Sequence, residues 1–147
     1  MLIVAWIVAF LAFAPDKPLQ HQSIIWSAAF DPAGGRIVTA ASDNTARIWD
    51  ASNGEPIGKP LQHQDQVWGA AFDPAGERVV TASDDKTARI WDASTGEPIG
   101  KPMQHRNGIN SAAFDSAGER IITASHDGTA RIWDARTGAP IGKPLRH

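Results

Sequence analysis

Short runs of apolar and small residues recur along this chain at a fixed period. From residue 17 onward each 42-residue unit holds four such runs, which in the first unit lie at residues 24–30, 36–41, 45–50 and 56–61. Gly, Pro, Asn and Asp fill the segments between the runs, as in short strands joined by tight turns. The pattern therefore predicts a four-stranded antiparallel meander in each unit.

Proline and glycine positions refine this prediction. Residues 31–34 read Asp-Pro-Ala-Gly, which suits a type I turn, because Pro presets φ at the second position and Gly accepts a positive φ at the fourth. The run at 56–61 contains two prolines, which only an edge strand tolerates. We therefore expect the fourth strand of each unit to lie at the outer edge of its sheet.

The middle runs have no polar face. In the second run Ile37 and Thr39 point to one side, and Val38 and Ala40 point to the other. A sheet with one solvated face would alternate cleanly between apolar and polar residues. We therefore expect each small sheet to be covered on both sides by its neighbours, and a stack of four-stranded sheets around an axis is a β-propeller.

The repeat is explicit in one hexapeptide, Thr-Ala-Arg-Ile-Trp-Asp. It occurs at residues 45–50, 87–92 and 129–134, a spacing of 42 residues both times. A fixed period near 40 residues is typical of solenoids, propellers and similar arrays. We place the repeats at 17–58, 59–100 and 101–142, and residues 143–147 open a fourth.

Over residues 17–147 the chain resembles the WD-repeat β-propeller family. Trp-Asp ends the third run three times, and Phe-Asp-Pro-Ala-Gly or Phe-Asp-Ser-Ala-Gly forms the first turn. The Gly-His pair of the family appears as Gln-His at 20–21, 62–63 and 104–105, so the loop before each first strand is expected to bend differently. The resemblance implies an all-β fold of four-stranded antiparallel propeller blades, in a ring that is incomplete or is completed by oligomerisation.

The resemblance also implies a hydrogen-bonded set of His, Thr, Asp and Trp in each blade. A buried Trp N–H needs an acceptor, Thr can accept it and donate onward, and His can relay to a carboxylate that would be costly to bury alone. The three sets by position are His21, Thr39, Asp43 and Trp49; His63, Thr81, Asp85 and Trp91; and His105, Thr123, Asp127 and Trp133.

A catalytic or metal-binding interpretation of these residues is disfavoured. The sets recur three times at the same spacing, each Thr is expected to face a Trp rather than a cleft, and the histidines lie 42 residues apart, whereas zinc ligands on one element lie two to five apart. His126 is expected to be a surface turn residue. The sequence contains no phosphate-binding loop or nucleophile elbow. We expect no catalysis, no cofactor and no metal.

The charge and the amino-acid composition limit the classes of partner and the compartment that we expect. The net charge is −2 with both signs mixed, so no basic field points to nucleic acid. There is no cysteine, which excludes disulfides and fits a reducing, cytoplasmic compartment.

Residues 1–16 stand outside the repeats. Residues 1–14 are apolar but are too few to span a bilayer, which needs roughly 20. We expect an unrelated leader or the edge of a truncated open reading frame. The alternatives are an export or membrane-attachment signal, with Ala12-Phe13-Ala14 as the small-x-small pattern, or a strand packed on the first repeat.

Positions that differ between repeats are candidates for partner binding. In the geometry of the family, the segments 22–26, 64–68 and 106–110 emerge with the turns at 42–44, 84–86 and 126–128 on one rim, where partners commonly bind. Aromatic residues and Arg are enriched at binding hot spots. The candidate rim residues are Trp26, Asp65, Trp68, Arg106, Asn110 and His126. The alternative for the two Trp residues is packing between neighbouring blades.

Three repeats leave a propeller open, because such rings close with about four to eight blades. The inner three runs occur three times, but the outer run occurs four times, near residues 17–20, 56–61, 98–103 and 140–145. Two outer runs would then compete for one edge. Either the chain is a piece of a longer array, which we favour because it stops where another first strand should begin, or two chains pair into a six-bladed ring.

The sequence thus predicts a non-catalytic protein-interaction scaffold, part of a larger propeller or signalling protein. Its partners would be other proteins, together with further WD repeats in cis or a second chain. The alternative is a lectin-like binder of small ligands that uses Trp26, Trp68 and Asp65, although Asn110 replaces the third Trp. An enzyme is the more distant alternative.

Overall fold

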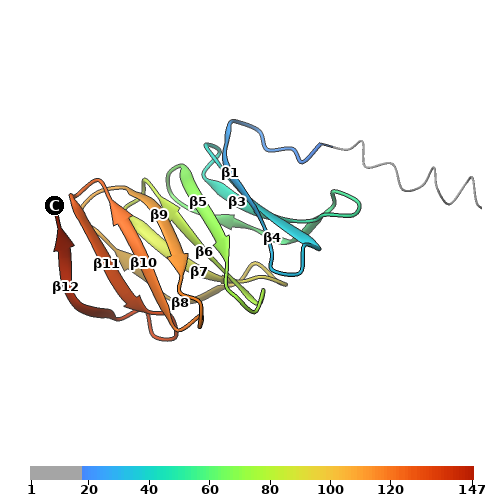
Figure 1. The fold of residues 1–147 in the computed structure, drawn as a ribbon. Helices are drawn as coiled ribbons and strands as arrows, with labels where there is room; N and C mark the ends of the chain where they lie inside the picture. The colour runs from blue at the N-terminus through green and yellow to red at the C-terminus, as the bar shows by residue number, and fades with distance from the viewer. Residues whose placement is uncertain (1–17) are drawn as a thin grey trace, which may run out of the picture.

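The structure, a computed structural model, describes residues 18–147, and in this range it contains twelve strands and no helix (Figure 1). The strands form three separate four-stranded antiparallel sheets, which we call blades 1, 2 and 3. Blade 1 consists of β1 (Ile25–Phe30), β2 (Arg36–Ala41), β3 (Thr45–Asp50) and β4 (Pro56–Gln62); blade 2 of β5 (Val67–Phe72), β6 (Arg78–Ser83), β7 (Thr87–Asp92) and β8 (Pro98–Gln104); and blade 3 of β9 (Ile109–Phe114), β10 (Arg120–Ser125), β11 (Thr129–Asp134) and β12 (Pro140–Arg146).

The order of strands within each blade follows the chain, so the predicted meander is confirmed. The predicted turn is also present, since the Gly34 N–H donates to the Asp31 carbonyl at 3.0 Å and Gly34 has a φ of 76°. The proline-rich strands β4, β8 and β12 each lie at one edge of their sheet, as the prolines require. Pro18, Leu19 and Gln20, which repeat the outer-run sequence, belong to no strand.

The blades stack in chain order (Figure 1), and an apolar cluster fills each junction. We call the side of a blade that meets the next blade its forward face, and the opposite side its rear face. Members of the two clusters are fully buried or nearly so. The first cluster joins the forward face of blade 1 to the rear face of blade 2 and contains Val38, Ala40, Ala46, Ile48, Leu61, Val67, Val79, Trp91 and Ala93. The second joins blades 2 and 3 through Val80, Ala82, Ala88, Ile90, Met103, Ile109, Ile121, Trp133 and Ala135.

Blade 2 alone is covered on both faces, so the expectation of two-sided cover does not hold for blades 1 and 3. On the rear face of blade 1, Ile25 and Phe30 are 39% and 65% exposed. On the forward face of blade 3, Ile122 is 47% exposed, whereas the equivalent Val80 of blade 2 is fully buried. The ring is therefore unclosed, with one apolar sheet face open at each end.

The interpretations of residues 1–16, including the leader, the export signal and membrane attachment, lie outside the described residues. Among residues 18–147, no helix is long and apolar enough to cross a membrane.

Close backbone contact between the outer strand of one blade and the next blade yields a first prediction. A Cβ at Gly96 would lie 2.5 Å from the Lys59 carbonyl oxygen, whereas a Cβ at Gly100 would meet nothing within 4 Å. Both glycines have a φ near 70°, which costs an Ala about 1 kcal/mol. We expect Gly100→Ala to lose about that much unfolding free energy, and Gly96→Ala about 1–3 kcal/mol more through overpacking. Chemical denaturation measures both, and equal losses would contradict the blade contact.

Candidate functional site

The structure brings the four members of each predicted set together. In blade 2, His63 Nδ1 lies 2.7 Å from Asp85 Oδ2, and His63 Nε2 lies 2.7 Å from Thr81 Oγ1. Trp91 Nε1 donates to the same Thr81 oxygen at 2.8 Å. The Thr81 oxygen thus accepts from Trp91 and contacts His63, and the second ring nitrogen of His63 contacts the carboxylate, so each polar group of the set has a partner within it. We call each set a tetrad.

The tetrads of blades 1 and 3 have nearly the same geometry. The His–Asp distances are 2.9 and 3.0 Å, the His–Thr distances 2.6 and 2.7 Å, and the Trp–Thr distances 2.8 Å. In all three, the His and Trp ring centroids lie 5.8 Å apart in an edge-on arrangement. The Gln that precedes each His is thus compatible with the complete hydrogen-bonded chain.

Each of the second and third tetrads also ties two blades together. The His63 N–H donates to the carbonyl of Asn44 in blade 1 at 2.9 Å, while its side chain bonds to blade 2. The His105 N–H donates in the same way to the Lys86 carbonyl at 3.0 Å. Asn44 and Lys86 both have a positive φ, 68° and 71°. The turn between the second and third strands of one blade therefore positions the histidine of the next.

The tetrad carboxylates are held ionised. Burial alone would raise the pKa of the Asp85 carboxyl, but hydrogen bonds from His63 and Thr87 outweigh it and keep that pKa below its ordinary value. Burial also raises the pKa values of the Asp43 and Asp127 carboxyls. Hydrogen bonds, chiefly from Thr45 to Asp43 and from Thr129 to Asp127, outweigh burial, so both pKa values lie below the ordinary value.

This geometry suits a structural role. The side chains of His21, His63 and His105 are fully buried, and each Thr hydroxyl contacts a Trp instead of an open cleft. A general base must reach a substrate proton within hydrogen-bond distance, and these histidines do not face solvent. Within the described part of the chain, no group of three or more metal-ligating side chains comes together.

The rim candidates Trp26 and Trp68 lie against each other. β1 and β5 each shift register at these residues, so each Trp is the extra residue of a β-bulge, and Asn110 is its equivalent in β9. The ring centroids of Trp26 and Trp68 are 4.9 Å apart. Trp26 remains 41% exposed and Trp68 is half-buried. The pair therefore both packs across the junction of blades 1 and 2 and presents aromatic surface.

The other rim candidates are exposed. Arg106 donates its N–H to Asp127 Oδ2 at 3.0 Å, and the His126 N–H donates to the Gly108 carbonyl at 2.9 Å. The Asp65 carbonyl accepts a bond from Ser83 Oγ at 3.0 Å. Their backbones are thus fixed, while their side chains are accessible. Whether they bind a partner stays a prediction.

Two neighbours of Trp26 were missed by the sequence reasoning. Ile24 is 59% exposed and Ile25 is 39% exposed. A signal was available for Ile24, because the other repeats carry Gln66 and Gly108 at its position. An exposed apolar residue in one repeat, where the others are polar or lack a side chain, marks a surface particular to blade 1.

The sequence model of the family described as "WD domain, G-beta repeat" matches residues 13–50, 54–92 and 96–134. The chain belongs to the WD-repeat family. Each matched segment ends at the Trp-Asp pair that closes β3, β7 or β11, so the predicted repeat count is confirmed. Proteins of this family typically serve as non-catalytic scaffolds for protein interaction.

Two known proteins show the extent of similarity. The "Probable cytosolic iron-sulfur protein assembly protein Ciao1" of Culex quinquefasciatus is 44% identical over 34 residues, which is 23% of this chain and 10% of that protein. The crystal structure of the computationally designed Ika8 protein is 28% identical with a TM-score of 0.74, over 85% of this chain and 37% of that one. The WD-repeat chain thus spans well under half the length of either protein.

The central Thr of the tetrad yields a second prediction. Thr81→Val keeps the shape but removes the hydroxyl, so the Trp91 N–H and His63 Nε2 lose their shared partner in a buried site. Each buried polar group left without a partner costs about 1–3 kcal/mol, and we expect a loss of about 2–4 kcal/mol in unfolding free energy. The exposed Thr137→Val is the matched control, with an expected loss below about 1 kcal/mol. Comparable losses would exclude the hydroxyl as the centre of the tetrad.

The lowered carboxyl pKa values yield a third prediction. An Asp with a folded pKa below its unfolded value of about 4 stabilises the protein above that pH, and the stabilisation is lost as pH falls through the folded pKa. We expect the Tm to fall steeply below about pH 4. Asp85→Asn should start with a lower Tm at pH 7 and show a smaller further fall on acidification, whereas the exposed Asp65→Asn should follow the wild type. Parallel acid profiles for Asp85→Asn and the wild type would contradict this role.

Proposed function

We propose that this WD-repeat chain is a non-catalytic scaffold that binds another protein through a rim patch made of Ile24, Ile25, Trp26 and Trp68. The observation that carries the proposal is the bulge residue Trp26, which is 41% exposed although it stacks on a second Trp. Trp is among the residues most enriched at binding hot spots. The other exposed rim candidates are Asp65, Arg106, Asn110 and His126.

The bulge explains how an aromatic side chain reaches the surface of a sheet. The extra residue has no partner in the ladder, which bends the strand and redirects its side chain. Ring contact at 4.9 Å holds Trp26 against Trp68 before any partner arrives. A prepositioned aromatic ring loses little conformational freedom on binding, and this favours affinity.

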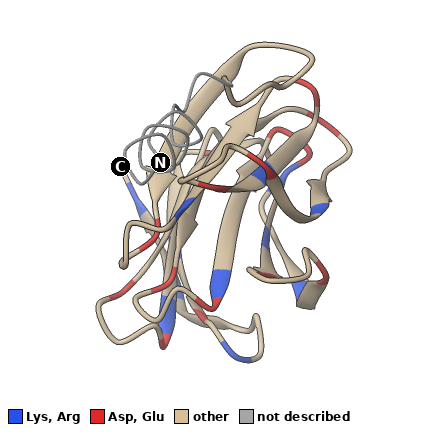
Figure 2. Cartoon of the chain, turned by 90° about the vertical axis from the view of Figure 1, so that its right-hand side faces the viewer, with Lys and Arg blue, Asp and Glu red and all other residues tan. Residues whose placement is uncertain are grey.

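Charge supports an apolar anchor over electrostatic recognition. Acidic and basic residues are interspersed over the chain (Figure 2), and the net charge is −2. No single-sign field would steer a highly charged partner. We therefore expect the bound segment to place an apolar or aromatic side chain on the Trp pair, and Arg106 and Asp65 to orient its polar groups.

The second candidate function is binding of a small polar ligand, in a lectin-like way. Trp68 Nε1 is buried and has no hydrogen-bond partner within the described part of the chain, and a ligand oxygen could accept it. Asn110 replaces the third Trp, so such a pocket would not recur between blades 2 and 3. This break favours the protein-binding proposal.

Covering the two free faces is also part of the proposal. Further WD repeats in cis, or those of a second chain, would meet the forward face of blade 3 and the rear face of blade 1. A place within a larger signalling protein in the cytoplasm remains the sequence prediction. The 34-residue similarity to Ciao1 is shorter than one 42-residue repeat and does not bring iron–sulfur assembly to this chain.

Peptide binding to the rim is the fourth prediction. Peptides selected from a random display library against the wild-type chain are expected to carry an apolar or aromatic residue and to bind Trp26→Ala at least tenfold more weakly by fluorescence titration. Ile141→Ala is the matched control, because Ile141 is 42% exposed but lies on blade 3. Selected peptides that bind both variants like the wild type would contradict the rim site. Binding of a glycan panel that depends on Trp26, without peptide binding, would favour the second candidate.

A further inference from the structure

One arginine contact defines the first blade junction. Arg36 donates through Nη2 to the Gly76 carbonyl and through Nη1 to the Ala93 carbonyl, at 3.5 Å for the second bond. Its guanidinium carbon lies 5.2 Å from the centroid of the Phe72 ring. Asp31 holds the arginine in place, since Arg36 Nε donates to Asp31 Oδ2 at 2.9 Å. Blade 1 thus inserts an oriented cation between a ring and two carbonyls of blade 2.

The second junction repeats this contact with residues 42 positions further on. Arg78 donates to the Gly118 carbonyl at 2.7 Å and to the Ala135 carbonyl at 3.2 Å. Its guanidinium carbon lies 5.0 Å from the centroid of the Phe114 ring, and Asp73 accepts from its Nε at 2.8 Å. Both junctions of the stack therefore contain the same arginine contact.

The donor half of a third contact stands open on the forward face of blade 3. Arg120 is held by Asp115 at 2.8 Å like its two equivalents, but its side chain is 59% exposed, whereas those of Arg36 and Arg78 are 26% and 25% exposed. A hollow of about 230 Å³ lies beside it, lined by Phe114, Asp115, Arg120, Ile121, Ile122 and Ile132. At the first junction, the equivalent face of blade 1 is covered, and Phe72 of blade 2 packs against the apolar cluster that contains Val38 and Ile48.

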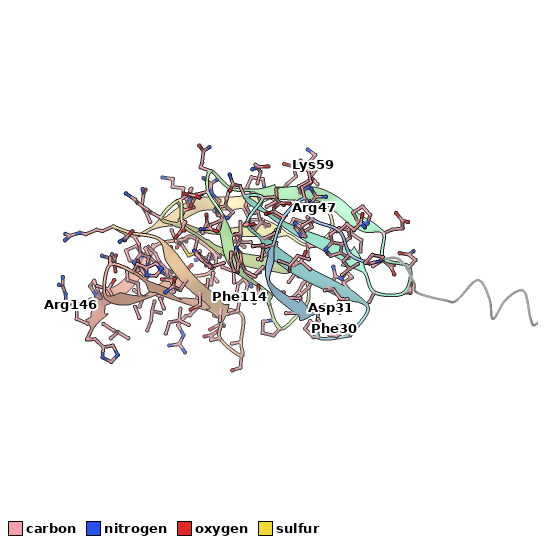
Figure 3. The ribbon with its side chains drawn as sticks, turned by 90° about the horizontal axis from the view of Figure 1, so that it is seen from above. Phe30, Asp31, Arg47, Lys59, Phe114 and Arg146 are labelled. Carbon is pink, nitrogen blue, oxygen red and sulfur yellow. The ribbon has the colours of Figure 1, made fainter. Side chains whose placement is uncertain are left out.

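The acceptor half stands open on the rear face of blade 1. Phe30, Gly34 and Ala51 precede Phe72, Gly76 and Ala93 by 42 residues. Phe30 is 65% exposed and lies at one end of the molecule (Figure 3). A Cβ at Gly34 would meet nothing within 4 Å, whereas one at Gly76 would lie 3.0 Å from the Arg36 guanidinium. One chain thus carries both halves of the junction, at opposite ends of its stack of blades.

We propose that the forward face of blade 3 binds the rear face of blade 1 in a second copy of this chain, with Arg120 over Phe30 of that copy and bonded to its Gly34 and Ala51 carbonyls. The inference rests on the blade cover included in the proposed function and names the second copy as its source. It shares Ile25 with the rim patch, because the equivalent Val67 is buried in the first apolar cluster, but it does not depend on Trp26 or Trp68. The apolar residues of blade 3 support this contact. Ile122 and Ala124 are exposed there, while their equivalents Val80 and Ala82 are fully buried at an inner junction.

Two copies suffice to close the ring. Each added junction repeats one step of the stack, so two chains of three blades make six, within the range of about four to eight at which propellers close, and three chains would make nine. A head-to-tail contact that closes gives a discrete ring, not a filament. Residues 18–147 of the two copies then form two identical intermolecular junctions, which cover the rear face of blade 1 and the forward face of blade 3 in each copy.

Closure requires one outer-strand end to move. At the first junction, Leu61 packs in the apolar cluster and His63 enters the tetrad of blade 2. His21 already fills that tetrad position for blade 1 and its side chain is fully buried. Leu145 and His147 repeat the motif of Leu61 and His63 at exposed positions. In the pair, His21 therefore keeps its place in the tetrad of blade 1, and the C-terminal end of β12 in the other copy moves aside. His147→Ala should therefore retain the pair. Loss of the pair in this variant would contradict the claim that His21, and not His147, fills the tetrad of blade 1.

Light scattering on a size-exclusion column over a concentration series tests the pair with the full chain of 147 residues. The expected mass is twice the 15.7 kDa of one chain. Arg120→Glu and Phe30→Arg should each weaken the pair at least tenfold, and both residues are exposed enough for the single chain to keep its fold. Arg136→Glu is the matched control, because it makes the same charge change at an exposed position in the turn between β11 and β12, outside both proposed sites.

Mixing the two weakened variants gives the decisive readout. The mixture should recover the pair. At one junction, Arg120 of the Phe30→Arg chain meets Phe30 of the Arg120→Glu chain, as in the wild type. At the other junction, the introduced glutamate meets the introduced arginine, and their opposite charges attract. Three results would overturn the proposal. The first is a wild-type monomer at about 100 µM. The others are an oligomer that survives both substitutions and an oligomer that is sensitive to Arg120→Glu but not to Phe30→Arg. A wild-type monomer that still binds rim peptides would overturn this inference alone, whereas a pair that binds none would overturn the rim proposal alone.

Discussion

A buried threonine hydroxyl is the point on which each blade depends. Thr81 Oγ1 accepts the Trp91 N–H and contacts His63 Nε2, and all three side chains are removed from solvent. None of these polar groups can find water instead, so each depends on the others. The hydroxyl thereby joins two strands of a sheet to a histidine whose backbone is bonded to the preceding blade.

Two kinds of force then hold blade to blade. The apolar clusters supply a non-directional attraction that grows with buried area. The tetrad histidine and the arginine that bonds to two carbonyls have fixed geometry, so they set the position of one sheet on the next. The stack is therefore a repeated step, and each end of it presents half of a junction.

Much of this architecture was predictable from the sequence, because a 42-residue period constrains every repeat at once. Run lengths and turn residues predicted the strands and the Asp31–Gly34 turn, and the family resemblance implied the tetrads. The bulge at Trp26 was not predictable, since a one-residue slip between strands has no local composition signal. The arginine junction was missed because its partners lie in another repeat, although Asp and Arg recur five residues apart at each first turn. Two-sided cover was predicted for every blade but holds for blade 2 alone, because a periodic pattern contains no information on where a stack ends.

Comparison of the repeats separates what joins the blades from what distinguishes them. The junction residues are the same type in all three repeats, with Phe30, Phe72 and Phe114 at one position and Arg36, Arg78 and Arg120 at another. Such a residue contacts a neighbouring blade, so a change in it would have to be matched across the junction. The bulge residues read Trp, Trp and Asn, and no ladder pairing constrains them. A partner that distinguishes this stack from another of the same family must therefore contact the rim, where a change affects binding without breaking a junction.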